Sequence, residues 1–256
     1  MLNKDLDFDK IRFEYLKNRR IKIDNFLDPK FAESVYSGFL DITKRNLWYQ
    51  SNLGNHRHYN PNLDENEFIY QHFTYHFEKY PVLNSRLSHF LAFDCRRLDI
   101  DPRKDNYMQI IKDMEEKPEL ELEEYHPFRR VANFLNSKDT YDLLSFITGH
   151  HLTYESVLIF ASKYSQGDFM GMHNDGGHPR KFAFVMGFTK DWLPHWGGST
   201  VITDEKREKV LDTYLPTFNS LILFDVPVFH YVSPVSNYAQ SDRMSFTGWY
   251  FDYKKP

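Results

Sequence analysis

Apolar side chains recur every three or four residues over much of the chain before residue 150, which is the spacing of an amphipathic helix. One stretch puts Phe31, Val35 and Phe39 on a single helical face, after a cap and first-turn pair at Asp28-Pro29. The pattern predicts helices over 5–18, 29–42, 65–79, 81–93, 127–135 and 139–148, and a short strand over 21–27.

The spacing shortens after residue 150, where runs of Val, Ile, Phe and Tyr alternate with turn residues. Strands are predicted over 153–163, 168–173, 181–188, 199–203, 210–214, 219–224, 228–232 and 243–252. So many short strands in about 100 residues are typical of a sandwich or barrel of the jelly-roll kind. We expect a single α+β domain over 1–256, in which a mainly helical supporting and variable region, 1–150, covers one outer face of a mainly β core, 151–256.

Composition and charge exclude several classes of protein. Lys and Arg number 32 and Asp and Glu number 36, so the formal charge of −4 lacks the basic footprint of a nucleic-acid binder. The single cysteine, Cys95, allows neither an intramolecular disulfide nor a cysteine-based zinc site, which fits a reducing compartment. The charged N-terminus is unlike a signal peptide, and no apolar run reaches the roughly 18 residues that span a bilayer. We expect a cytoplasmic protein with no membrane partner and no strong nucleic-acid signal, although a local basic patch is compatible with this charge; its oligomeric state stays open.

The segment GMHNDGGHPR (171–180) contains the first candidate for chemistry. His173 and Asp175 are two residues apart, so in an extended segment both side chains project from the same face and can meet one metal ion. The best third ligand is His230, which follows a strongly apolar strand. With 12 histidines and 36 acidic residues, a lone His-x-Asp match is weak. Two histidines and one carboxylate nevertheless form the facial triad of non-haem Fe(II) oxygenases, which leaves three coordination positions open.

A candidate anion-binding group follows in RMSFTGWYFD (243–252). In an alternating strand, Arg243, Ser245 and Thr247 face the same way and put a cation and two hydroxyls on one wall. A guanidinium can bind a carboxylate through two parallel hydrogen bonds. An inward Arg243 surrounded by Phe246, Trp249 and Phe251 needs an anionic partner, because an unpaired buried charge is costly. Trp249 itself is expected to be a wall residue of the barrel.

The C-terminal hundred residues resemble the Fe(II)- and 2-oxoglutarate-dependent dioxygenases, specifically their prolyl-hydroxylase-like branch. The matching segments, in the order and spacing of the family, are KYSQGDFMGMHND (163–175), FTKDWLPHWGGSTVI (188–202), PTFNSLILFD (216–225), HYVSPV (230–235) and RMSFTGWYFD (243–252). The stretch RRIKIDNFLDPKFAESVYSGFL (19–40) resembles the opening strand and helix of this branch, whereas 45–135 matches nothing we can name. The resemblance implies a double-stranded β-helix, a cupin-like jelly roll, with the N-terminal helices packed on one outer face.

The resemblance also implies an activity and the residues that carry it. His173, Asp175 and His230 would hold Fe(II), and Arg243 would bind the far carboxylate of the cosubstrate 2-oxoglutarate. With O₂ as the oxidant, and with ascorbate open as a reductant, the enzyme would hydroxylate an unactivated C–H bond and release succinate and CO₂.

Several further positions either match the residue that the family has there or differ from it. Tyr164 matches a tyrosine that lines the cosubstrate pocket, and Thr247 matches a hydroxyl position beside it. Many relatives have Tyr-Tyr-Leu where this chain has Met-Gly-Phe, so a pocket-lining tyrosine is missing at Gly187, and Tyr164 or Ser245 would compensate. The related halogenases carry Gly or Ala in place of Asp175, so the carboxylate at this position favours hydroxylation.

The substrate stays open between a protein residue such as proline and an amino-acid-like small molecule. Loops around the barrel mouth, expected at 48–64, 100–125 and 176–180, would choose between them, and the acidic segment 112–125 is interpreted as an exposed loop. A cupin-like metal-binding or sensing module without turnover is the main alternative, but it has no need of Arg243 and the paired hydroxyls. A metal-dependent hydrolase or isomerase would require a general base separate from the metal ligands, and the sequence offers no clear candidate.

Overall fold

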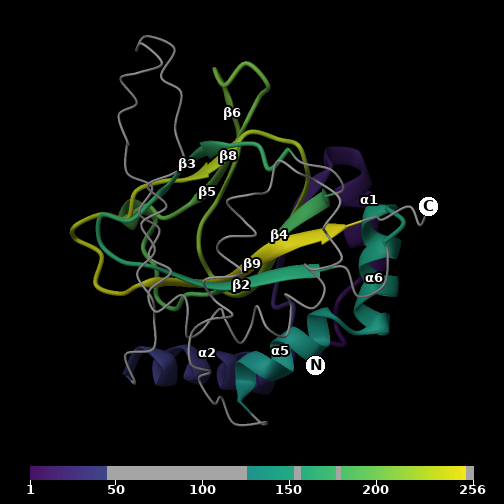
Figure 1. The fold of residues 1–256 in the computed structure, drawn as a ribbon, viewed down its shortest axis with the longest axis horizontal. Helices are drawn as coiled ribbons and strands as arrows, with labels where there is room; N and C mark the ends of the chain where they lie inside the picture. The colour runs from purple at the N-terminus through teal and green to yellow at the C-terminus, as the bar shows by residue number, and fades with distance from the viewer. Residues whose placement is uncertain (45–125, 153–156, 177–179, 252–256) are drawn as a thin grey trace, which may run out of the picture.

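The computed structural model describes residues 1–44, 126–152, 157–176 and 180–251 (Figure 1). The helices predicted over 65–79 and 81–93 and the acidic segment 112–125 lie outside these residues. So do the expected mouth loops 48–64 and 100–125 and most of the third, 176–180. The extent of a single domain over 1–256 therefore stays a prediction.

Two antiparallel sheets form the centre of the described structure. The larger sheet has the strand order β1-β7-β4-β9-β2, and the smaller has the order β3-β8-β5-β6. This arrangement confirms the predicted jelly roll, the double-stranded β-helix with a mainly β core. The strands are β1 (Arg20–Asp24), β2 (Val157–Tyr164), β3 (Met170–His173), β4 (Arg180–Phe188), β5 (Thr200–Thr203), β6 (Val210–Tyr214), β7 (Phe218–Asp225), β8 (His230–Val232) and β9 (Arg243–Phe251).

The N-terminal strand belongs to the larger sheet, although more than a hundred residues separate it from the other strands of that sheet. β1 pairs with β7 from Arg20 opposite Phe224 to Asp24 opposite Ser220, and so forms one edge of the sheet. The prediction of a strand over 21–27 is wrong at its C-terminal end. Asn25 has a φ of 53°, in the left-handed region, and this turn ends the extended conformation.

The described helices agree closely with the predicted ones: α1 (Phe8–Asn18), α2 (Pro29–Lys44), α5 (Pro127–Leu135) and α6 (Lys138–Thr148). α1 begins at residue 8 rather than 5, because the side chain of Asp7 caps it by accepting a hydrogen bond from the backbone N–H of Lys10. Ser137 caps α6 in the same way, and Gly149 ends it with a φ of 72°. None of the helices among the described residues is both long and apolar enough to cross a membrane.

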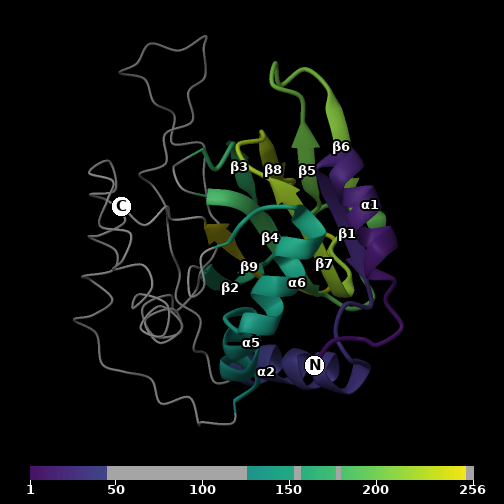
Figure 2. The ribbon, with the colours of Figure 1, turned by 90° about the vertical axis from the view of Figure 1, so that its right-hand side faces the viewer.

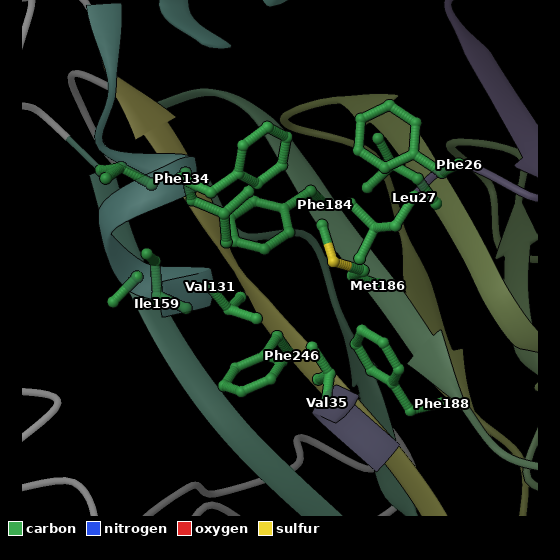
Figure 3. Packing of buried hydrophobic residues seen from close by; sticks show 14 of the residues in the cluster. Phe26, Leu27, Val35, Val131, Phe134, Ile159, Phe184, Met186, Phe188 and Phe246 are labelled. Carbon is green, nitrogen blue, oxygen red and sulfur yellow. The ribbon is translucent and has the colours of Figure 1, made fainter. Parts of the chain in front are cut away.

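The helices cover the outer face of the larger sheet, as predicted (Figure 2). The ring centroid of Phe39, on α2, lies 5.2 Å from that of Phe246 on β9 and 4.7 Å from that of Phe128 on α5. Figure 3 shows the same cluster, in which side chains from the helices meet Phe184, Met186 and Phe246 of the sheet. Burying this many aromatic side chains is the main force that holds the helices on the sheet.

The inner face of the larger sheet packs against the smaller sheet. Ala183, Val185, Ile222 and Phe224 of the larger sheet form one buried cluster with Ile202 of the smaller. Because side chains alternate along a strand, this pattern assigns the odd-numbered residues of β4 and of β9, its neighbour, to the interior between the sheets.

Asp225, at the end of β7, joins three separate parts of the chain. Its carboxylate accepts hydrogen bonds from the Tyr15 hydroxyl and from Arg19 Nε, the second at 2.6 Å. His150 Nε2, just beyond α6, lies 2.8 Å from Asp225 Oδ1. Burial raises the pKa of Asp225, but the hydrogen bonds from His150, Tyr15 and Arg19 outweigh it, so the pKa lies below its usual value.

Candidate metal centre

Three potential metal ligands meet at the end of β3. His173 is the last residue of β3 and lies directly opposite His230, the first residue of β8. Asp175 Oδ1 is 3.5 Å from His173 Nε2, and Asp175 Oδ2 is 3.3 Å from His230 Nε2. All the ligand atoms lie within 4.8 Å of one another, so one metal ion could contact the three side chains.

The reason for this convergence differs from the predicted one. An extended segment would place residues 173 and 175 on one face, but β3 ends at His173 and Asp175 has a φ of 54°. Asp is one of the few residues that adopt this left-handed conformation readily. A turn of the backbone, rather than the alternation of a strand, therefore brings the carboxylate back to the two imidazoles.

Both imidazoles are oriented by backbone carbonyl groups. His173 Nδ1 lies 2.8 Å from the carbonyl oxygen of Gly171, and His230 Nδ1 lies 2.8 Å from that of Val228. A carbonyl oxygen only accepts hydrogen bonds, so Nδ1 is the donor in each ring and Nε2 is the nitrogen directed at Asp175. Histidine ligands of metals are commonly held by such a second hydrogen bond. The two Nε2 atoms are the ring nitrogens nearest the Asp175 carboxylate.

Asp175 is itself held by two side chains. Trp249 Nε1 donates a hydrogen bond to Asp175 Oδ2 at 2.7 Å, and Arg180 Nη1 lies 3.5 Å from Asp175 Oδ1. Burial raises the pKa of the Asp175 carboxyl, but the neighbouring His230 and His173 outweigh it and hold the pKa well below its usual value. The group is therefore a carboxylate at neutral pH, as a metal ligand must be. The sequence analysis placed Trp249 on the barrel wall and missed this contact.

Arg243 is buried between the sheets without a carboxylate partner among the described residues. Its Nη1 donates to Ser245 Oγ at 3.4 Å and its Nη2 to Thr200 Oγ1 at 3.3 Å, while Nε has no partner within the described ranges. The guanidinium carbon lies 4.7 Å from the centre of the Tyr164 ring. Burial lowers the pKa of Arg243, yet an arginine stays protonated at any physiological pH.

The surroundings of Arg243 correct one detail of the sequence analysis. Phe246 packs in the outer core with Phe39 and Phe128, on the far side of the larger sheet. It therefore does not lie beside Arg243, because even-numbered residues of β9 face outward. Tyr164, directly opposite Arg243 on β2, provides the aromatic contact instead.

A comparison with protein-family models gives a match within the C-terminal part of the chain. Residues 159–251 match the model described as the 2OG-Fe(II) oxygenase superfamily. These residues form a 2OG-Fe(II) oxygenase domain. The match begins in β2 and ends at the last residue of β9, so it includes all three potential ligands and Arg243.

Two curated relatives of this oxygenase domain are prolyl 3-hydroxylases. The chain is 31% identical over 96 residues to prolyl 3-hydroxylase OGFOD1 of Mus musculus, covering 35% of this chain and 17% of the relative. It is 33% identical over 113 residues to the Xenopus laevis protein of the same name, covering 42% and 22%. The chain thus spans about a fifth of the length of these curated relatives.

A solved structure supports the fold. A prolyl hydroxylase from Trichoplax adhaerens, in complex with a hypoxia inducible factor oxygen degradation domain peptide fragment, has a TM-score of 0.51 and 14% sequence identity. The similarity covers 96% of this chain and 89% of that one.

The donor atoms of the oxygenase domain suit Fe(II). Two imidazole nitrogens and one carboxylate, with no thiolate, match the facial triad of non-haem iron proteins. The unpartnered Arg243 Nε and the two weakly bonded Nη groups fit a ligand with a carboxylate, since a buried guanidinium has donors to spare. The residues present therefore fit both groups that the family name implies.

Two predicted hydroxyl positions lie on the inner face of β9 with Arg243. Ser245 is buried and its Oγ lies 2.9 Å from Ser162 Oγ on β2, besides accepting from Arg243. Thr247 lies on the same face, half-buried and opposite Val185. Tyr164 is buried, and burial raises the pKa of its hydroxyl to about 12.

Gly187 lies opposite Ser245 and Ser220 on the inner face, where the family tyrosine is missing. An added Cβ would lie 2.4 Å from the backbone oxygen of Thr217 and 2.8 Å from Ser220 Oγ. The chain before β7 therefore occupies the space beside Gly187. The difference from the family is therefore that backbone and Ser220 fill this part of the inner wall, and not simply that one tyrosine side chain is missing.

Proposed function

We propose that this chain is an Fe(II)- and 2-oxoglutarate-dependent dioxygenase that hydroxylates an unactivated C–H bond. In the overall reaction, 2-oxoglutarate, O₂ and the C–H substrate give succinate, CO₂ and the hydroxylated product. The observation that carries the proposal is the pairing of a His-Asp-His cluster with a buried, carboxylate-free Arg243 in one double-stranded β-helix. A cupin-like module that only binds metal would have no use for that arginine.

His173, Asp175 and His230 are the proposed ligands of Fe(II). The bound iron and 2-oxoglutarate supply the oxidising chemistry, which no side chain can provide. The residues of this chain contribute geometry. The carbonyls of Gly171 and Val228 fix the tautomer of the imidazoles, and three ligands leave three positions for cosubstrate and oxygen.

Arg243 is the proposed partner of the far carboxylate of 2-oxoglutarate. Thr200 and Ser245 accept hydrogen bonds from its two Nη atoms and so orient the guanidinium. The Tyr164 ring, 4.7 Å from the guanidinium carbon, adds a cation–π contact that favours the buried cation. Thr247 and Ser245 are proposed to border the same cosubstrate site.

A protein residue such as proline is the favoured substrate, and an amino-acid-like small molecule is the second. The support is the pair of prolyl 3-hydroxylase relatives and the structural relative that is bound to a peptide fragment. Ascorbate is proposed only as a reductant that keeps iron in the ferrous state.

Succinate formation separates an oxygenase from a metal-binding module. The protein is incubated with Fe(II), 2-oxoglutarate, O₂ and ascorbate, with and without proline-containing peptides or free proline, and succinate is measured by mass spectrometry. We expect succinate from the wild type and none from His173→Ala. Intact metal binding without succinate under any condition would favour the cupin-like module.

The role of Arg243 is tested by the variant Arg243→Met, which keeps the aliphatic stem and removes the charge. A charge-assisted hydrogen bond contributes about 1.5–3 kcal/mol, so the affinity for 2-oxoglutarate should fall roughly 10- to 150-fold in calorimetry with Mn(II) in place of Fe(II). Arg130→Met is the matched control, because Arg130 stacks on Phe31 at the outer surface. Equal affinities of Arg243→Met and the wild type would contradict the assignment.

A further inference from the structure

We infer that Trp249, supported by Arg180, is a positioning residue that makes Asp175 bind the metal through one oxygen. The inference rests on the proposed function, since it assumes that Asp175 is a ligand. It assigns a role to a residue that the sequence analysis placed on the barrel wall. Among the described residues, Trp249 and Arg180 are the only groups besides the two histidines that contact the Asp175 carboxylate.

The indole of Trp249 fixes the rotation of the carboxylate. Its Nε1–H donates to Asp175 Oδ2 at 2.7 Å, the length of a strong, charge-assisted hydrogen bond. Trp249 comes from β9 of the larger sheet, whereas Asp175 follows β3 of the smaller one, so the bond also joins the sheets. Without it, the carboxylate could rotate about its last side-chain torsion, which is broad and weakly restrained.

Arg180 holds the indole in place. Its guanidinium carbon lies 4.1 Å from the centre of the Trp249 ring, within the range of a cation–π contact. The same side chain donates from Nη1 to the Asp175 backbone oxygen at 3.4 Å and lies 3.5 Å from Oδ1. Arg180 thus contacts both members of the pair, and a planar guanidinium can do so better than a lysine.

The two carboxylate oxygens consequently have different surroundings. Oδ2 accepts the indole N–H and lies 3.3 Å from His230 Nε2, whereas Oδ1 lies 3.5 Å from both His173 Nε2 and Arg180 Nη1. Because the indole N–H already occupies one lone pair of Oδ2, Oδ1 is the oxygen we assign to a metal held by both Nε2 atoms. Binding through one oxygen keeps three coordination positions open, and chelation by both would close one of them.

Trp249→Phe removes the N–H and keeps an aromatic ring for Arg180. Loss of such an outer hydrogen bond commonly costs about 10- to 100-fold in metal affinity. We expect a loss in this range for Mn(II), measured from the electron paramagnetic resonance signal of the free ion. The visible spectrum of the Co(II) protein should also change, because the carboxylate is free to chelate or to swing away.

Trp192→Phe is the matched control. Trp192 Nε1 also donates a hydrogen bond, at 2.9 Å, but to the backbone oxygen of Gly197 rather than to a ligand. This variant should keep the Mn(II) affinity and Co(II) spectrum of the wild type. Arg180→Met should show the same spectral change as Trp249→Phe with a smaller loss of affinity, and it decides the matter if Trp249→Phe does not fold.

The outcomes separate this inference from the proposed function. If the wild type binds Mn(II), His173→Ala does not, and Trp249→Phe keeps both the affinity and the spectrum of the wild type, the positioning role is refuted and the metal site stands. If the wild type and His173→Ala bind Mn(II) equally, the metal site itself is wrong, and the inference is overturned with it.

Discussion

Replacing Gly187 by alanine tests how closely the chain packs against the inner face of β4. An added Cβ would lie 2.4 Å from the Thr217 backbone oxygen, a distance at which something must move. The separation must reach at least 3.0 Å, so the oxygen or the strand has to shift by at least 3.0 − 2.4 = 0.6 Å. A backbone carbonyl cannot rotate away as a flexible side chain can.

The expected cost follows from this overlap. Forcing extra atoms into a packed interior costs about 1–3 kcal/mol. Alanine also increases the free energy of unfolding by about 0.4–1 kcal/mol, because it reduces the conformational entropy of the unfolded chain. The net loss is therefore at most about 2.6 kcal/mol and centres at about 1.3 kcal/mol, which should lower Tm by roughly 3–5 °C for a protein of this size. Since Gly187 lies opposite Ser245, a shift there should also weaken 2-oxoglutarate binding.

Calorimetric unfolding of the metal-free protein measures the first effect. The double variant Gly187→Ala, Ser220→Ala removes the 2.8 Å contact with Ser220 Oγ and leaves the 2.4 Å contact with Thr217, so it should remain destabilised. Ser220→Ala alone serves as the control. A Tm of Gly187→Ala equal to that of the wild type would show that the backbone before β7 does not fill this space.

Two further variants test contacts outside the site. Asp225→Asn should destabilise the fold at neutral pH, because the pKa of Asp225 is lowered in the folded protein. The difference in unfolding free energy from the wild type should be full above the unfolded pKa of about 3.9 and should shrink as the pH falls through the lower folded pKa. A difference that grows on acidification would contradict this. Tyr250→Phe removes the hydroxyl that donates a hydrogen bond, at 2.7 Å, to the Leu135 carbonyl oxygen. The variant should lose about 1–3 kcal/mol of unfolding free energy in urea. An unchanged urea midpoint would show that this hydrogen bond contributes nothing to stability.

The local pattern of the chain determined most of the elements and the types of residue at the site. Apolar spacing near 3.6 residues located α2 and α5, because one helical face must be apolar to be buried on the sheet. Likewise, the His-x-Asp pair and the downstream histidine and arginine indicated the chemistry, because few other residue types bind Fe(II) and a carboxylate. These are properties of neighbours along the chain, so they can be seen without coordinates.

Only the tertiary structure decided what stands opposite each of these residues. Trp249 and Asp175 are 74 positions apart, and Arg243 and Thr200 are 43 apart. Strand alternation shows which way a side chain points but not which strand of the other sheet it meets. The same holds for Gly187, which reads as a missing tyrosine until the Thr217 carbonyl is seen beside it. Contacts across two packed sheets depend on their register and on the turns between strands, which short-range patterns do not specify.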